Sequence, residues 1–264
     1  MISTFLSSKF RKYMHPSIST CSYNKHCACY YNINDAAMYH SLNDVLPDVI
    51  SDLTHFYDIR DVPYFTVFMY PDGASMSEAF NRALPNDQCC FVPIKNAYPL
   101  ITFTARIAMT SVKQVLIHEL SHIVFAQVTG AHEINDVQQT IPVWIDEGIA
   151  LYLDSAYRSD LDALKQKRVQ MIKQCGPNAL PRLSSQYTYF NKLDTDNEFG
   201  PIGMAAYAYS YFCISMLIKQ SNHATVMHFL KSLAVTTADL DDLFHSSFGI
   251  SIDTFDNNMR EGVF

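Results

Sequence analysis

Two histidines and a glutamate within one five-residue segment are the residues of this chain best suited to chemistry. His118 and His122 are four positions apart, and Glu119 follows the first of them directly. On a helix, positions i and i+4 lie on one face, one turn apart, so both imidazoles can reach the same metal ion. Glu119 is offset around the helix and can take a proton from a water that attacks a carbonyl group. The spacing predicts one zinc ion per chain, with Glu119 as the general base.

The flanking sequence predicts the helix that this motif requires. Ser111 and Gln114 form a candidate capping box, and Gly130 suits the position after the last turn, which gives a helix over 111–129. A stripe of apolar residues supports it: Val112, Val115, Leu116, Leu120, Ile123 and Val124. Two histidines and a glutamate buried on such a helix without a metal would each need another partner.

A zinc site that keeps one position open for substrate needs a third protein ligand. The acidic and histidine candidates downstream are His132, Glu133, Asp136, Asp146, Glu147 and Asp154. Val128 stands six residues beyond His122, so the histidine spacing of metzincins is absent. A second helix is predicted over 142–154, because Pro142 suits a first turn and apolar residues recur at Ile145, Ile149 and Leu153.

The two segments together resemble the gluzincin zinc metallopeptidases, especially peptidase MA-like domains and the aminopeptidase N family. The match rests on the 118–122 motif and on Trp-x-x-Glu-Gly-x-Ala-x-Tyr over 144–152. The resemblance implies that Glu147 is the third ligand. It also implies an α+β fold, a thermolysin-like zincin with a small mixed sheet and a mainly helical C-terminal half. Gly148 and Ala150 are small enough to let the helices over 111–129 and 142–154 approach each other closely.

Two acidic neighbours of Glu147 have other expected roles. Asp146 points about 100° away around the helix, which makes it the weaker candidate ligand. Asp154 falls where the family has an acidic residue, and the resemblance implies that it orients a zinc-bound histidine. The alternative for Asp154 is a solvated carboxylate at a helix end.

Peptide hydrolysis also needs a donor for the oxyanion that forms in the transition state. The segment 207–217 resembles the tyrosine helix of the same family, and the match places the donor at Tyr207. Tyr209 and Tyr211 remain alternatives, since tyrosines on an apolar helix are often core residues with a satisfied hydroxyl.

The rest of the chain is predicted as a small sheet followed by a helical half. A helix is expected over 41–57, with Pro47 in its first turn or at a break, and strands over 64–70 and about 99–105. The resemblance places the substrate-binding edge strand at 98–106. Residues 1–90 are predicted to be an α/β region of uncertain role, and 91–264 the peptidase MA-like catalytic domain.

Charge and composition exclude several other classes of protein. The formal net charge is −7, which argues against a nucleic-acid partner. Residues 1–16 have basic side chains but no apolar core behind them, so no secretory signal is predicted. A cytoplasmic location is expected, and export as an effector or toxin stays open. The low-charge stretch 200–218 is interrupted by polar residues, so no membrane span is expected. The oligomeric state stays open.

The seven cysteines predict reduced thiols, because their number is odd and their spacing is sparse. A second metal at Cys21, His26, Cys27 and Cys29 is the alternative, although a matching second half is missing. The neighbouring Cys89 and Cys90 are predicted to be buried thiols beside a strand.

The function predicted from these residues is a zinc-dependent metallopeptidase that acts on peptide or protein substrates. The segment 73–78 lacks the asparagine of the aminopeptidase motif that holds a free amino terminus, which favours an endopeptidase. The alternative is a catalytically silent zincin-fold module that binds or regulates a partner.

Overall fold

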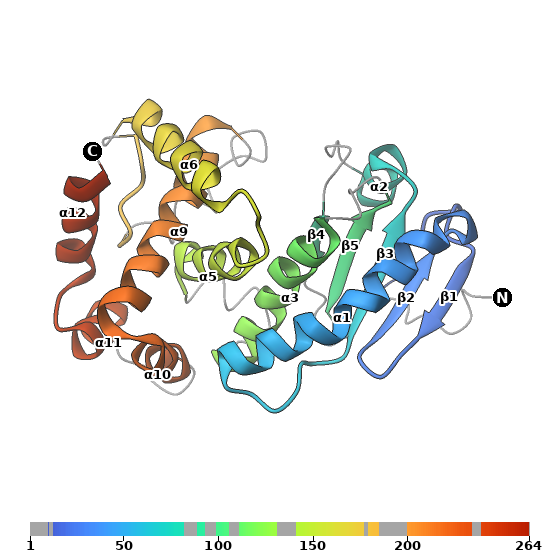
Figure 1. Ribbon diagram of the computed structural model, residues 1–264, viewed down its shortest axis with the longest axis horizontal. Coiled ribbons are helices and arrows are strands. Elements are labelled where there is room, and N and C mark those ends of the chain that lie inside the picture. The colour runs from blue at the N-terminus through green and yellow to red at the C-terminus, as the bar shows by residue number, and fades with distance from the viewer. Residues whose placement is uncertain are drawn as a thin grey trace. The chain divides into compact units, whose positions relative to one another are not determined.

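The chain folds into two compact units, Met1–Val124 and Phe125–Phe264. The computed structural model describes residue 10 and residues 13–81, 89–92, 99–105, 111–130, 141–176, 179–184, 200–233 and 239–263. Every described strand belongs to the first unit, and the described part of the second unit is helical (Figure 1). The boundary between the units falls inside helix α3 (Val112–Val128). The functional division at residue 90 stays a prediction.

The first unit is built around a five-stranded mixed sheet with the order β1-β2-β3-β5-β4. Its strands are β1 (Thr20–Tyr23), β2 (Cys27–Tyr31), β3 (Phe65–Tyr70), β4 (Cys89–Val92) and β5 (Leu100–Thr104). β1 and β2 form an antiparallel hairpin, β2, β3 and β5 are parallel, and β4 runs antiparallel to β5. The predicted strands at 64–70 and 99–105 are confirmed.

The predicted edge strand at 98–106 is wrong, because β5 is an inner strand. β4 pairs with its outer side, with Cys89 opposite Phe103 and Val92 opposite Leu100. β4 therefore takes the edge position. Cys89 and Cys90 lie in this strand, and the burial predicted for their thiols lies outside the described side chains.

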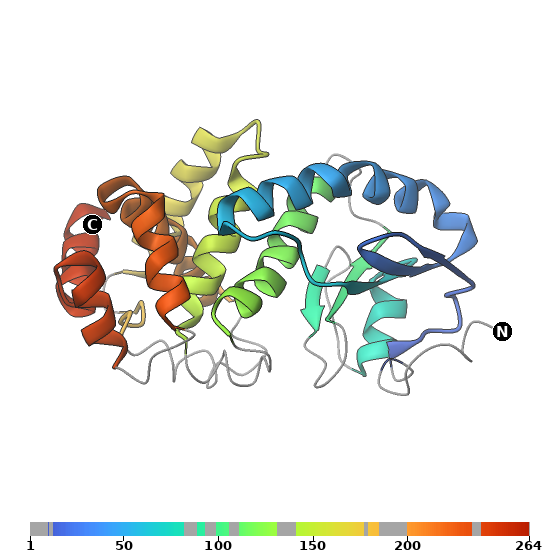
Figure 2. The same ribbon diagram turned by 90° about the horizontal axis from the view of Figure 1, so that it is seen from below.

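Helices cover both faces of the sheet (Figure 2). α1 (Ala36–Tyr57) follows a 3-10 turn, η3 (Ile33–Asp35), and lies on the opposite face from α2 (Gly73–Phe80). The α2 face encloses a core cluster: Phe10, Ile18, Ala28, Tyr30, Phe68, Tyr70, Met76 and Leu100. The alternation of side chains along a strand turns Phe68 and Tyr70 toward this cluster, and Val67 and Met69 away from it.

The first long helix starts earlier than its apolar spacing indicated. α1 begins at Ala36, so Pro47 lies in its interior and not in its first turn, which corrects the prediction for 41–57. Asn32 starts the segment because its side chain accepts a hydrogen bond from the backbone N–H of Asn34 at 2.9 Å. Proline cannot donate a backbone hydrogen bond, and burial of one face of α1 compensates for this loss. The buried face includes Leu42, Leu46, Val49, Leu53 and Tyr57.

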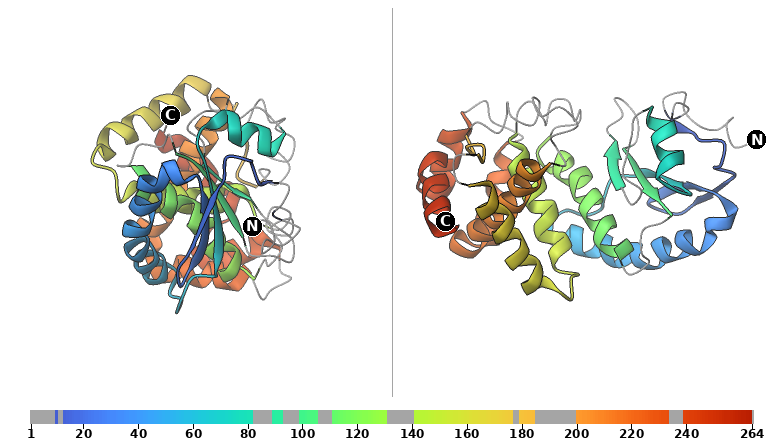
Figure 3. Two further views of the ribbon diagram at one scale, coloured as in Figure 1. Left: turned by 90° about the vertical axis from the view of Figure 1, so that its right-hand side faces the viewer. Right: turned by 90° about the horizontal axis from the view of Figure 1, so that it is seen from above.

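The second unit is organised around one long helix, α9 (Pro201–Ser221). It packs against α5 (Val143–Ser155), α6 (Leu161–Cys175) and α10 (His223–Leu233) (Figure 3). α11 (Leu240–Phe248) and α12 (Ile252–Val263) complete the unit. Trp144, Phe229, Phe244 and Phe255 form an aromatic core in which neighbouring ring centroids are 5.6–6.5 Å apart. The α+β fold and the helical C-terminal half are confirmed.

Within the described residues, α9 is the one helix whose length and composition would allow it to cross a membrane. Of its most apolar window, 56% is buried inside the protein. This burial is what the central helix of a helical core requires, since such a helix is apolar on most of its surface.

Candidate metal centre

The motif 118–122 lies in the middle of α3, as predicted. This helix is buried on most sides, since Leu116, Ile117, Leu120, Ile123 and Val124 are each at most 3% exposed. Glu119 and His122 are nearly buried, at 7% and 8% exposure, and His118 is half-buried. Gly130, with a φ of 71°, follows the helix in the left-handed conformation predicted for it.

The α3 helix is fixed to α1 by a buried tyrosine. The Tyr57 hydroxyl lies 2.7 Å from the Ser121 Oγ and donates a hydrogen bond to the Ser121 carbonyl at 3.3 Å. Both residues are fully buried. Because Ser121 directly precedes His122, this contact restrains the turn of α3 that carries the second histidine. The sequence did not single out Tyr57, whose position on the apolar face of α1 looks like ordinary core.

The structure brings His118, His122 and Glu147 together. One ligand atom from each lies within 4.8 Å of the others, and the two imidazole centroids are 5.0 Å apart. Ligand atoms at about 2.0–2.2 Å from zinc are at most about 4.4 Å from one another, so small rotamer movements would close the set around an ion. Two imidazoles and one carboxylate are also the ligand types that an open zinc site uses. The residues present therefore fit zinc.

Among the described residues this is the one cluster of at least three histidine, cysteine or acidic side chains that could hold a metal. Asp146 is described and does not belong to it. His132, Glu133 and Asp136, the other candidate ligands, lie outside the described residues.

Glu147 is positioned by the close packing of α5 on α9. Pro142 precedes the first turn of α5, and the next residue of the motif, Gly148, faces α9. A Cβ atom built on Gly148 would lie 2.6 Å from the Ile214 Cγ1 and 2.7 Å from the Ser210 carbonyl oxygen. The backbones thus approach to a distance that only glycine allows. The small residue was predicted to bring this helix close to the one that carries 118–122; at Gly148 the close approach is to α9 instead.

The three candidate tyrosines of α9 have different surroundings. Tyr209 is fully buried and its hydroxyl donates to the Asp256 carboxylate at 2.7 Å. Tyr211 is 4% exposed, with the Arg168 guanidinium 4.1 Å above its ring. Tyr207 is half-buried and lies one turn before Ser210, on the stripe of α9 that meets Gly148.

Burial and the neighbouring Cys213 and Asp256 raise the pKa of Tyr209 far above its ordinary value. Its hydroxyl is therefore neutral and engaged in the core of the second unit. Tyr209 has the environment of a structural residue.

Asp154 is tied into a buried ionic cluster. Its carboxylate lies 3.7 Å from the Arg158 Nε and 4.0 Å from the Arg168 guanidinium, and the Ser155 hydroxyl lies 3.2 Å away. At 5% exposure it is not the solvated helix-end carboxylate of the alternative interpretation. The orienting role toward a zinc-bound histidine stays a prediction.

Arg168 is the residue of this region that sequence reasoning missed. It is 6% exposed although it carries a charge, and it lies on α6 one turn before the buried Ile172. Arg168 stands where the helical spacing of α6 calls for an apolar residue, and this is the sequence signal that could have identified it. A charged residue at a buried position usually has a partner.

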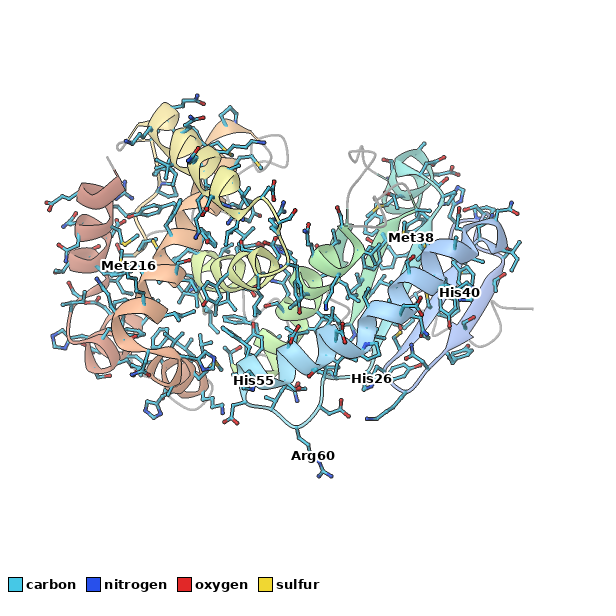
Figure 4. The ribbon with its side chains drawn as sticks, in the orientation of Figure 1. His26, Met38, His40, His55, Arg60 and Met216 are labelled. Carbon is cyan, nitrogen blue, oxygen red and sulfur yellow. The ribbon has the colours of Figure 1, made fainter. Side chains whose placement is uncertain are left out.

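The N-terminal cysteines do not form a second metal group. Cys27 and Cys29 are free thiols, each 1% exposed, on β2. His26, labelled in Figure 4, lies 3.5 Å from an Asp61 carboxylate oxygen. Burial raises the pKa of the Cys27 thiol to about 11, and it also raises the pKa of the Cys29 thiol well above its usual value. The alternative of a metal at this cluster thus finds no support in the described residues.

The fold and the His-His-Glu cluster define a thermolysin-like zincin. The chain belongs to the Peptidase MA superfamily, whose sequence model matches residues 66–264. Two solved structures are similar. An M1 zinc metallopeptidase E323A mutant from Deinococcus radiodurans has a TM-score of 0.50 and 13% identity. The M1 zinc metallopeptidase from the same organism has a TM-score of 0.48 and 16% identity.

Each of these alignments covers 94% of this chain and 52% of the other, so the chain spans about half the length of these peptidases. No curated protein is similar enough to count as a match. The predicted relationship to the peptidase MA-like gluzincins is confirmed.

Proposed function

We propose that this protein is a zinc-dependent metallopeptidase, and that it cleaves within peptide chains. The observation that supports it most strongly is the proximity of His118, His122 and Glu147, with Glu119 on the same turn as the first histidine. Membership of the Peptidase MA superfamily agrees with this chemistry.

In the proposed mechanism His118, His122 and Glu147 hold one zinc ion. When bound, zinc supplies a Lewis acid that polarises the scissile carbonyl and lowers the pKa of water to about 7. Glu119 accepts the proton of the attacking water and passes it to the departing amine. Tyr207 donates a hydrogen bond to the oxyanion that develops on the substrate.

The preference for internal bonds rests on segment 73–78. Its residues form the first turns of α2, where Asp72 caps the helix by accepting from the Ser75 N–H at 2.9 Å. Glu78 lies 3.2 Å from His15 and its side chain is 76% exposed. Among the described residues, Glu78 is therefore too exposed to enclose the free amino terminus of a substrate.

The activity is tested by incubating the zinc-loaded protein with paired peptides that have a free or an acetylated amino terminus. Equal cleavage of both members, at internal bonds, is expected for an endopeptidase. Cleavage of the free peptides alone would contradict the endopeptidase assignment. If zinc is bound tightly and no peptide is cleaved, the silent binding module is the better description.

The metal itself gives the first prediction. The purified protein should bind one zinc ion per chain, and His118→Ala should lose most of it, because each ligand contributes to the affinity of a three-ligand site. Metal analysis after dialysis measures the stoichiometry. His40→Ala, which removes a histidine of α1 remote in sequence from the cluster, is the control and should keep its zinc. Equal zinc content in wild type and His118→Ala would refute the ligand set.

The donor tyrosine gives the second prediction. Tyr207→Phe should lower kcat by about 10²-fold, because loss of an oxyanion donor has effects of that order. Zinc content and folding should stay unchanged. Tyr209→Phe is the matched control, since it removes a hydroxyl from the same helix. It should cost about 1–3 kcal/mol of stability by leaving a buried carboxylate with one donor fewer, with kcat unaffected. If Tyr209→Phe lowered kcat and Tyr207→Phe did not, Tyr209 would be the oxyanion donor.

A further inference from the structure

Arg168 connects the helix that carries Glu147 to the helix that carries Tyr207. From α6, its Nη1 donates to the Ser155 hydroxyl at 3.0 Å and its Nη2 lies 4.0 Å from the Asp154 carboxylate, both at the end of α5. The same guanidinium lies 4.1 Å above the ring of Tyr211 on α9. One planar, buried cation therefore contacts both helices at once.

Because α5 is a regular helix, the contacts that Arg168 makes with the end of α5 also restrain the position of Glu147. Glu147 and Asp154 are seven residues apart, so they lie on the same face within about 20° and two turns from each other. A restraint on Asp154 and Ser155 therefore limits rotation of α5 about its own axis. Gly148 fixes how near α5 comes to α9, and the Arg168 contacts add a polar restraint at the far end of the same helix.

On α9 the same reasoning links Tyr211 to Tyr207. They are four residues apart and share one broad face of the helix. The ring of Tyr211 is held under Arg168, so the face that carries Tyr207 has a defined orientation. Since α6 packs directly against α9, the arginine has a rigid base.

We propose that Arg168 is a positioning residue that sets the orientation of Glu147 and Tyr207 by joining the Asp154–Ser155 end of α5 to the Tyr211 ring of α9. The inference rests on the proposed function, in which Glu147 is a ligand and Tyr207 a donor. Arg168 touches neither the metal nor the substrate in this scheme; it acts through the two helices.

The second unit offers a matched control. Arg260 on α12 is also a buried arginine, at 8% exposure. It donates to the Asp256 carboxylate at 2.9 Å and to the Pro181 carbonyl at 2.7 Å, and lies 5.4 Å from the Tyr209 ring. It thus has the same partner types as Arg168: a carboxylate on a helix, an uncharged oxygen acceptor and a tyrosine of α9. None of these three contacts involves α5.

The test compares wild type, Arg168→Met, Arg168→Lys and Arg260→Met, each confirmed as folded by circular dichroism at low temperature. Zinc affinity is measured by competition with a chromophoric chelator, and the cobalt-substituted proteins are compared by their visible absorption. Arg168→Met should weaken zinc binding by about 10-fold, as loss of a group that orients a ligand does, and should shift the cobalt bands. Arg168→Lys should recover part of the affinity, because it keeps the charge but not the plane over Tyr211.

Arg260→Met should melt at a lower temperature than wild type and yet keep the wild-type zinc affinity and cobalt spectrum. The inference is overturned if Arg168→Met binds zinc as wild type does, or if Arg260→Met weakens zinc binding as much. If the proposed function is wrong, Arg168→Met still weakens zinc binding, but the wild-type protein cleaves no peptide. Cleavage by wild type with no zinc effect in Arg168→Met is failure of the inference alone.

Discussion

Glu119→Gln should remove peptide hydrolysis almost completely while leaving zinc bound. Glutamine has nearly the same shape as glutamate but cannot accept the proton of the attacking water, and general-base catalysis contributes about 10²–10⁴-fold to the rate. Glu119 is not one of the three residues of the metal cluster, so the affinity for zinc should change little. Steady-state cleavage of an internally quenched peptide, with zinc content determined on the same sample, measures both quantities.

The control for this experiment is Glu78→Gln. It makes the same chemical change at an exposed carboxylate of α2 that is paired with His15, and its activity should equal that of wild type. If Glu119→Gln cleaved as fast as wild type with its zinc in place, the glutamate would not be the base. If the variant had lost its zinc, Glu119 would have a structural role in the metal centre.

Gly148→Ala should destabilise the second unit, although glycine to alanine in a helix is usually favourable. The new Cβ would lie 2.7 Å from the Ser210 carbonyl oxygen, which belongs to the backbone and cannot rotate away. Moving α5 off α9 to relieve this contact should cost about 1–3 kcal/mol, as overpacking of a core does. Because Glu147 is the preceding residue, zinc affinity should fall as well. Denaturant unfolding and chelator competition measure the two effects.

Gly262→Ala is the matched substitution for this prediction. Gly262 is also helical, in α12, and a Cβ built on it meets no atom within 4 Å. It should stabilise the protein by up to about 1 kcal/mol through the intrinsic preference of alanine for helices. A Gly148→Ala protein as stable as Gly262→Ala would show that α5 and α9 do not pack as described.

The parts of the site that the sequence predicted are those set by short-range spacing. His118, Glu119 and His122 share one helix, and the periodicity of α3 is visible in the sequence itself. Glu147 was assigned through the resemblance of segment 144–152 to the gluzincin pattern, in which the third ligand directly precedes a glycine. These features depend on residues a few positions apart, which is the range over which sequence patterns carry structural information.

What the sequence did not predict depends on partners far along the chain. Nothing near Tyr209 shows that its hydroxyl binds Asp256, forty-seven residues later. Nothing near Asp154 shows that the Arg168 guanidinium lies 4.0 Å from its carboxylate. The position of β5 inside the sheet required knowledge that β4 pairs beyond it. The interior Pro47 shows the same limit, since burial of the long apolar face outweighs one missing backbone hydrogen bond.

The buried thiols give each unit its own chemical reporter. Cys27 and Cys29 are enclosed in the first unit and Cys213 is fully buried in the second. Burial raises the pKa of all three, so the reactive thiolate forms only when the surrounding structure opens. Alkylation at Cys27 or Cys29 therefore records opening of the sheet, and alkylation at Cys213 records opening of the helices around α9. Mass spectrometry of labelled peptides can thus follow the two halves of the molecule separately, in one sample and without an introduced probe.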